Sequence, residues 1–187
     1  SEEQKSAPPI IKNLGVNFAD YNSETKKAGD FLFTIGISNN IILGEFGQKV
    51  TDINGILKAL PHYTYYVPKN TPIIAVSDGE VIAVWSQEET KDYAIHVKPV
   101  YDSYWSIGYD HVVPIVKENQ TIKAGDIIAN SGDFNIAPLE ISIESEKENS
   151  GTFYPLFSYF DSSLKQEFEK KVWKLISDWE NYKGNKN

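Results

Sequence analysis

Hydrophobic and polar positions alternate with a period of two through the middle of this chain, and the alternation predicts β-strands. Residues 139–143 alternate apolar and polar side chains, as in a strand with one buried face. Two continuous apolar runs precede them, at 112–116 and 127–129, and glycines lie in the connections, where tight turns need a permissive backbone. The pattern therefore predicts a mainly β, antiparallel domain organised around residues 105–145.

Two hairpins are predicted upstream of this core. Apolar runs at 72–77 and 80–85 flank an Asp-Gly pair at 78–79, which favours a type I′ turn between adjacent strands. Residues 93–97 and 104–109 form a second pair of strand-like runs. Each pair would place neighbouring segments side by side in one antiparallel sheet.

Near the C-terminus the hydrophobic spacing changes to three and four residues, which predicts an amphipathic helix. Asp161, Ser162 or Ser163 is placed to cap its start, and Gly184 is placed to end it. The apolar stripe consists of Leu164, Phe168, Val172, Leu175, Trp179 and Tyr182. We expect this stripe to pack on the β-domain; docking to a partner helix is the alternative.

Three regions follow from these patterns. Residues 1–30 are polar and irregular and contain a Pro-Pro pair, which predicts a flexible N-terminal tether. Residues 31–160 form the β-domain, within which the weak helical spacing of 50–60 predicts one short helix. Residues 161–187 form the C-terminal helix packed on that domain.

Composition narrows the function classes. The net charge of −8, from 18 Lys and Arg against 26 Asp and Glu, leaves no basic footprint for nucleic acid. The absence of cysteine excludes disulfides and thiolate metal ligands. No apolar run reaches the roughly 18 residues of a membrane span, so no transmembrane segment is predicted. The chain also lacks methionine, even at position 1, and we expect a trimmed or mature fragment whose signal peptide has been removed.

Short motifs follow one another in a fixed order between residues 71 and 159. They are Thr-Pro-Ile-Ile-Ala-Val-Ser-Asp-Gly-Glu-Val (71–81), Tyr-Asp-His (109–111), Val-Lys-Glu-Asn-Gln (116–120), Ile-Lys-Ala-Gly-Asp-Ile-Ile (122–128), Ser-Gly (131–132) and Tyr-Pro-Leu-Phe-Ser-Tyr (154–159). In this order they resemble the core of the lysostaphin-type (LytM-like) zinc endopeptidases. The resemblance implies the duplicated hybrid motif, a small antiparallel β-sandwich or barrel, and a protein related to enzymes that cut peptide cross-links in bacterial cell walls.

The resemblance also implies a zinc site, and this chain departs from the family at the first ligands. The family takes them from a His-x-Gly-x-Asp segment, which falls on Leu60 and Thr64 when counted back from Pro72 without a gap. A register shifted to His62 recovers the histidine but places Tyr66 at the aspartate. Neither register supplies the pair of ligands that the family uses.

The last family ligand comes from a His-x-His pair on the final strand. Here Pro138 and Glu140 occupy the two histidine positions, and Glu140 offers one carboxylate without partners. His111, in Tyr-Asp-His, keeps the position of a family histidine that lies beside the metal-bound water. Because zinc enzymes need three converging protein ligands, we predict no metal and no other cofactor.

A protein that has lost its metal ligands can keep the substrate groove and use it for binding. The lining of such a groove is predicted from polar and aromatic residues of the last strands. The candidates are His111, Tyr109, Glu140, Trp105 and Tyr104. His62 is interpreted as a loop residue and His96 as a structural histidine of a strand.

These observations predict a catalytically inactive, peptidase-like domain of the bacterial cell envelope, secreted or anchored through the N-terminal tether. Its expected partner is peptidoglycan, a peptide or an envelope hydrolase. Two alternatives stay open. One is an active metallopeptidase with the atypical ligands Glu140, His111 and His62. The other is a carrier or phosphotransfer domain of the same fold, with His111 as the histidine that would be phosphorylated.

Overall fold

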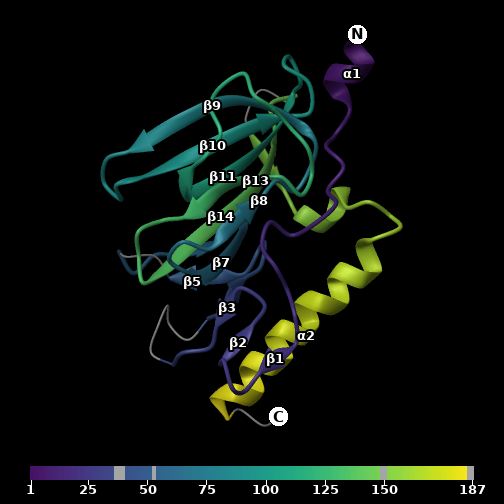
Figure 1. The fold of residues 1–187 in the computed structure, drawn as a ribbon. Helices are drawn as coiled ribbons and strands as arrows, with labels where there is room; N and C mark the ends of the chain where they lie inside the picture. Colours follow the sequence, from purple (N-terminus) through teal and green to yellow (C-terminus); the bar gives the residue numbers. More distant parts are fainter. Residues whose placement is uncertain (36–40, 52–53, 148–150, 185–187) are drawn as a thin grey trace.

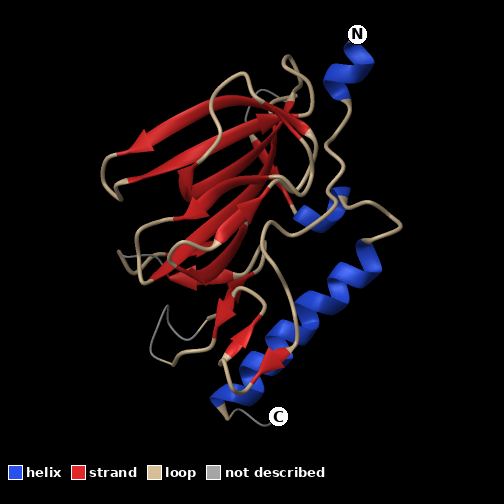
Figure 2. Cartoon of the chain, viewed as in Figure 1, coloured by secondary structure: helices blue, strands red, loops and turns tan. Residues whose placement is uncertain are grey.

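Antiparallel strands dominate the structure, a computed structural model that describes residues 1–35, 41–51, 54–147 and 151–184 (Figures 1 and 2). The main sheet contains β4 (Leu43–Gly44), β7 (Tyr63–Pro68), β8 (Pro72–Ile74), β9 (Gly79–Gln87), β10 (Asp92–Lys98), β11 (Trp105–Pro114), β12 (Thr121–Ile122), β13 (Ile127–Ser131), β14 (Ile136–Ser145) and β15 (Thr152–Tyr154). Its order is β12-β9-β10-β11-β14-β7-β4, while β13 pairs with β11 and β8, and β15 pairs with β14. The predicted mainly β, antiparallel fold is confirmed.

Smaller elements surround this sheet. They are α1 (Glu2–Ser6), the sheet of β1 (Tyr21–Asn22), β2 (Lys27–Ala28) and β3 (Phe31–Leu32), the pair β5 (Lys49–Thr51) and β6 (Leu57–Ala59), a 3-10 turn η2 (Leu156–Tyr159), and α2 (Lys165–Lys183). No helix in the described ranges is long and apolar enough to cross a membrane.

The alternation in β14 gives the main sheet two different faces. Along β14, buried and half-buried residues alternate without exception. The buried set includes Leu139, Ile141 and Ile143, and it packs with Ile107 and Tyr109 of β11 in the core. The opposite face carries the polar residues of the same strands, and it is the face on which the candidate site lies.

The first 30 residues differ from the expected flexible tether. Ile11 and Leu14 are fully buried, and Val16 and Phe18 are nearly so, in one core with the main sheet. Backbone hydrogen bonds join Ile11 to the chain at Tyr159 and Asp161. Leu14, Val16 and Phe18 alternate with a period of two, but the run is short and lies in a segment whose Pro-Pro pair and polar residues indicate a tether, which is why it was not predicted as core.

The C-terminal helix buries part of its apolar stripe. Val172, Leu175 and Trp179 are buried, and α2 runs along β1 and β2 at one end of the molecule (Figure 1). Gly184 ends the helix with φ of +80°, the left-handed conformation that a glycine adopts at little cost. The start differs from the expectation: Leu164 is the N-cap residue and makes no side-chain cap, while the Asp161 carboxylate accepts from Ser163.

Two local predictions are wrong. The segments 72–77 and 80–85 do not form a hairpin, because β8 pairs with β13 while β9 pairs with β10. The Asp78 carboxylate accepts from the Ala124 amide at 2.9 Å instead, which ties this turn to a distant loop. The segment 50–60 is the strand pair β5 and β6 rather than a helix; residues 52–53 of it lie outside the described part. The second predicted hairpin is confirmed, since β10 pairs with β11.

Candidate functional site

A row of polar residues crosses the half-exposed face of the main sheet. Strand register places Asp110 opposite Glu140, and Glu140 opposite Thr64. Directly opposed residues of antiparallel strands project on the same side, with Cβ atoms about 4.5–5.5 Å apart. We call this surface the polar face; its residues are Thr64, His96, Gly108, Asp110, Glu140 and Ser142.

The middle of the polar face has no room for a side chain at position 108, where a glycine stands. A Cβ atom added there would lie 2.7 Å from the Ser142 hydroxyl oxygen and 3.7 Å from Nε2 of His96. Beside it, the His96 ring contacts the Trp85 ring at 4.4 Å between centroids. Burial lowers the pKa of His96, so this ring resists protonation and serves as a packed strand residue, as the sequence predicts.

His111 is held at the end of the row by a buried carboxylate. Its Nδ1 lies 2.9 Å from Oδ2 of Asp92, whose side chain is fully buried and whose Oδ1 accepts from the Thr90 hydroxyl at 2.5 Å. Because a carboxylate only accepts, Nδ1 of His111 carries the proton, and Nε2 of the neutral ring is then an acceptor. A buried partner of this kind fixes both the tautomer and the direction of the ring.

The backbone of His111 is also unusual. Its φ is +61°, a region that few residues other than glycine adopt. The Gly132 amide donates to the His111 carbonyl at 3.0 Å and helps to hold this conformation. Strained backbone of this kind persists only where surrounding contacts enforce it, and it concentrates at functional sites.

Asp110 is tied down through one of its oxygens. Oδ1 accepts from Nε2 of Gln87 at 2.7 Å and from the His111 amide at 3.2 Å. The structure shows no hydrogen bond to Oδ2 from the residues it describes. Asp110 therefore keeps one carboxylate oxygen for a ligand.

Glu140 carries a negative charge next to histidine. Its Oε1 lies 3.2 Å from Nε2 of His62, and both side chains are largely buried, with 26% and 15% of their surfaces exposed. Burial alone would raise the pKa of Glu140, but His62, His111 and Lys58 outweigh it and hold the pKa below its ordinary value. Glu140 is therefore ionised at neutral pH.

Three side chains with ligating atoms converge here. Asp110, His111 and Glu140 each place one ligating atom within 4.8 Å of the others. Of the five residues predicted to line a groove, His111 and Glu140 are brought together. Tyr109 and Trp105 are not: Tyr109 is fully buried with its hydroxyl oxygen accepting from the Val76 amide at 2.8 Å, and Trp105 is buried and donates through Nε1 to the Ser6 carbonyl at 2.9 Å.

Tyr104 also lies away from the cluster. Its amide donates to the Lys5 carbonyl at 2.9 Å, so it belongs to the contact between β11 and α1. The period of two explains the misplacement of Tyr109 and Trp105, since both residues sit on the opposite side of β11 from Asp110.

Sequence reasoning missed other residues of this cluster. Asp92 lies in a charged stretch with no strand alternation, and its burial is seen only in the fold, where its side chain has no exposed surface. His62, interpreted as a loop residue, contacts Glu140 across the strand pair. The shifted His-x-x-x-Tyr register was the signal for His62, because it aligns a histidine with a family ligand position.

The donors present do not reproduce the zinc site that the resemblance implies. Strand β7 reads Tyr-Thr-Tyr-Tyr-Val-Pro, so Thr64 or Tyr66 stands at the aspartate in either register. Thr64 offers a neutral hydroxyl, and burial together with the charge of Glu140 raises the pKa of Tyr66, which therefore stays a neutral phenol. Zinc in proteins is bound by thiolate, imidazole or carboxylate, and β7 supplies none of these.

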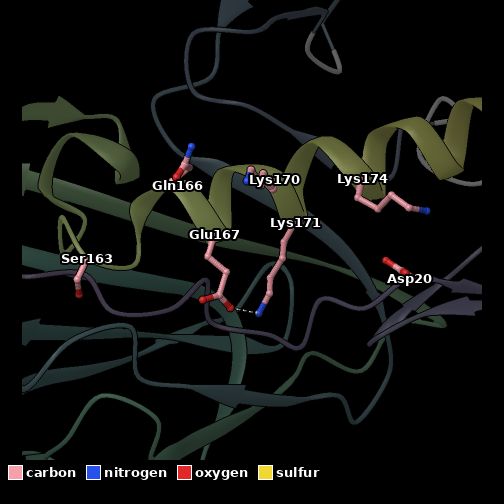
Figure 3. Close-up of a pocket in the computed structure, with 7 residues that line it drawn as sticks. All are labelled: Asp20, Ser163, Gln166, Glu167, Lys170, Lys171 and Lys174. Carbon is pink, nitrogen blue, oxygen red and sulfur yellow. Dashed lines mark ion pairs between the residues drawn. The ribbon is translucent and has the colours of Figure 1, made fainter.

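A separate hollow lies along α2, on elements that carry none of the clustered residues (Figure 3). It has a volume of about 580 Å³ and is lined by Asp20, Ser163, Gln166, Glu167, Lys170, Lys171 and Lys174. Lys171 pairs with Glu167 at 2.9 Å, and Lys174 pairs with Asp178 at 2.5 Å. These charged side chains are partly exposed and pair with neighbours on the same helix, so they do not form a preorganised binding site.

Comparison with known proteins identifies the β core. Residues 63–149 match the model of peptidase family M23. The catalytic domain of the antimicrobial peptidase lysostaphin from Staphylococcus simulans superposes with a TM-score of 0.51 at 24% identity, over 65% of this chain and 92% of that one. Csd3 of Helicobacter pylori superposes with a TM-score of 0.54 at 13% identity, over 98% of this chain and 46% of that one.

The matches cover only part of the longer known proteins. The chain spans about half of the lysostaphin chain in a solution structure, with 51% covered. No curated protein sequence matches the chain. Residues 63–149 are therefore similar to peptidase family M23, and the β core shares the fold of the lysostaphin catalytic domain.

Proposed function

We propose that this chain is a catalytically inactive peptidase-like domain of the bacterial cell envelope, and that its polar face binds the peptides of peptidoglycan. The observation that carries the proposal is the composition of β7, which supplies no carboxylate beside Glu140. Without a third anionic or imidazole donor from this strand, the water-activating chemistry of a zinc peptidase has no metal centre to work from.

Binding is supported by what the polar face retains. Asp110, His111 and Glu140 converge, and His111 is oriented by a buried carboxylate. Such preorganised polar groups on a half-exposed sheet suit a ligand with several hydrogen-bonding groups, as a peptide has. The same surface would serve if the partner were an envelope hydrolase that the domain regulates.

Co-sedimentation with purified peptidoglycan tests the proposal. A tryptophan at Ser142 would stand on the polar face beside Gly108 and block it, whereas a tryptophan at the exposed Ser162 leaves that face untouched. We expect wild-type protein and Ser162→Trp to sediment with peptidoglycan and Ser142→Trp to remain in solution. Equal sedimentation of both variants, or none by the wild type, would contradict the proposal.

A second candidate is an active metallopeptidase with atypical ligands. The specific observation in its favour is the convergence of Asp110, His111 and Glu140 within 4.8 Å. It requires His111 to act as a ligand rather than as a neighbour of the bound water. Metal stoichiometry separates the two candidates.

A further inference from the structure

The cluster on the polar face consists of hydrogen-bond acceptors. Asp110 keeps one free carboxylate oxygen, Glu140 is ionised, and His111 presents Nε2 because Asp92 occupies Nδ1. A ligand that satisfies all three must bring donors or a positive charge.

Thr64 gives independent evidence that a group is expected at this place. It is 4% exposed and lies directly opposite Glu140, yet its Oγ1 has no hydrogen-bond partner among the residues that the structure describes. Within the described ranges, Oε1 of Gln87, whose amide nitrogen binds Asp110, also lacks a partner, as does Nε2 of His62. Buried polar atoms are nearly always satisfied, so two unsatisfied oxygens around one cluster indicate a missing donor.

We infer that Asp110, His111 and Glu140 form a receptor for a primary ammonium group carried by the peptide that binds the polar face. The inference rests on the proposed function and names the chemistry of its ligand, a peptide with a free amino group. An ammonium has three N–H donors and no acceptor, which complements a cluster made only of acceptors. Hydrogen bonds from a charged donor to a carboxylate are about twice as strong as neutral ones.

The spacing of the three atoms is compatible with an ammonium group. An ammonium nitrogen lies about 2.8 Å from each acceptor, so acceptors in tetrahedral directions lie about 4.6 Å apart. Zinc ligands at about 2.0–2.1 Å lie only about 3.3 Å from one another. The three atoms here lie within 4.8 Å of one another, a limit that includes both spacings, so the preference for an ammonium rests on the acceptor character of the cluster.

Charges around the cluster leave room for one further cation. Asp92, Asp110 and Glu140 are acidic, and the basic groups facing them are His62, His111 and Lys58. Lys58 lies on the exposed strand β6 and acts on Glu140 at a distance without an ion pair in the described structure. The cluster therefore holds more carboxylates than permanently charged basic groups, and an ammonium would balance the excess.

Two matched tripeptides test the inference directly. N-acetyl-Gly-Lys-Gly-amide carries the only amine, and N-acetyl-Gly-norleucine-Gly-amide has a similar side-chain length without it. We expect the lysine peptide to shift the His111 ring signals in NMR titrations and to bind about tenfold more tightly than the norleucine peptide. Asp110→Asn keeps the size of the side chain and should reduce binding of the lysine peptide to the norleucine level.

Glu144→Gln is the control, because Glu144 lies on the same strand and side as Glu140 but outside the cluster. It should bind the lysine peptide like the wild type. Equal binding of the two peptides, absence of shifts at His111, or equal losses in Asp110→Asn and Glu144→Gln would overturn the inference. Saturation of the same signals by zinc alone, at one ion per chain, would replace the ammonium by a metal.

Peptidoglycan with acetylated amino groups separates this inference from the proposed function. If acetylation abolishes co-sedimentation, the result supports both peptidoglycan binding and the ammonium receptor. If acetylated and untreated material bind equally, the ammonium receptor is refuted while peptidoglycan binding stands. If neither binds, the proposed function fails, and the tripeptide titration alone decides whether the cluster receives an ammonium.

Discussion

Replacing Trp179 with alanine should destabilise the whole protein, because this side chain joins α2 to the N-terminal strands. Trp179 is 3% exposed and meets the Phe33 ring edge to face at 5.2 Å between centroids. The Tyr182 ring stacks on Trp179 at 5.7 Å and also contacts Phe33 at 5.5 Å between centroids. Removing the indole therefore opens a cavity between the helix and the segment that follows β3.

The expected loss follows from the buried area. A buried aromatic side chain removes about 150–250 Å² from water, worth about 4–6 kcal/mol at 25 cal/mol per Å². Measured substitutions of this type cost about 3–5 kcal/mol, since neighbouring side chains partly relax into the cavity. For a chain of this size, such a loss lowers the melting temperature by roughly 6–20 °C.

Urea unfolding followed by far-UV circular dichroism measures this loss, and the same helix offers a matched control. Trp173 is 69% exposed, so Trp173→Ala should change the free energy of unfolding by no more than about 0.5 kcal/mol. A Trp179→Ala variant as stable as Trp173→Ala would refute the packing. Two separate transitions in the wild type would show that α2 unfolds independently of the β-domain.

Three further outcomes are expected. Tyr109→Phe leaves the buried Val76 amide without its acceptor and should cost about 1–3 kcal/mol in urea unfolding, whereas Tyr101→Phe at an exposed site should cost nothing measurable. Because the pKa of Glu140 is lowered in the folded state, its ionised form stabilises the protein above pH 4.5, and this stability is lost as the pH falls through the folded pKa. Glu140→Gln should therefore weaken the decrease in stability at acid pH. An unchanged decrease would contradict the lowered pKa of Glu140. Burial lowers the pKa of His96 below 6.5, so the unfolded state takes up the proton first and stability should fall as pH drops below 6.5; His96→Gln should remove that dependence, measured as melting temperature from pH 7.5 to 5.5.

The strand pattern could be predicted from sequence where one face is buried and the other is open. The alternation at 139–143 and the pairing of 93–97 with 104–109 both appear in the structure as β14 and as β10 with β11. The helical stripe was predictable for the same reason, since its period alone shows which side is buried. Local patterns therefore gave these elements their position and their buried face.

Long-range partners could not be predicted in the same way. The Asp-Gly pair at 78–79 has the chemistry of a hairpin turn, but β8 and β9 find different partners, and nothing local encodes that choice. The alternation of Leu14, Val16 and Phe18 is only three apolar positions long, so it did not predict the burial of this segment in the core. In both cases tertiary contacts decide the outcome over local preference.

The candidate site shows the same division. Glu140 and His111 were identified because they occupy matched motif positions, and the structure brings them together. Asp92 is separated from His111 by 19 residues and contacts it only through the pairing of β10 with β11. Tyr109 and Trp105 were assigned to the wrong side of β11, because a motif places residues along a strand without fixing which face each one occupies.

The absence of a catalytic zinc is the central claim, and metal stoichiometry combined with hydrolysis tests it most directly. Protein purified without chelators is exposed to excess zinc, dialysed and analysed for metal by mass spectrometry, while the same sample is incubated with cross-linked peptidoglycan. The composition of β7 predicts far less than one zinc per chain and no released peptide. One zinc per chain, with hydrolysis that disappears in Glu140→Ala, would contradict the account.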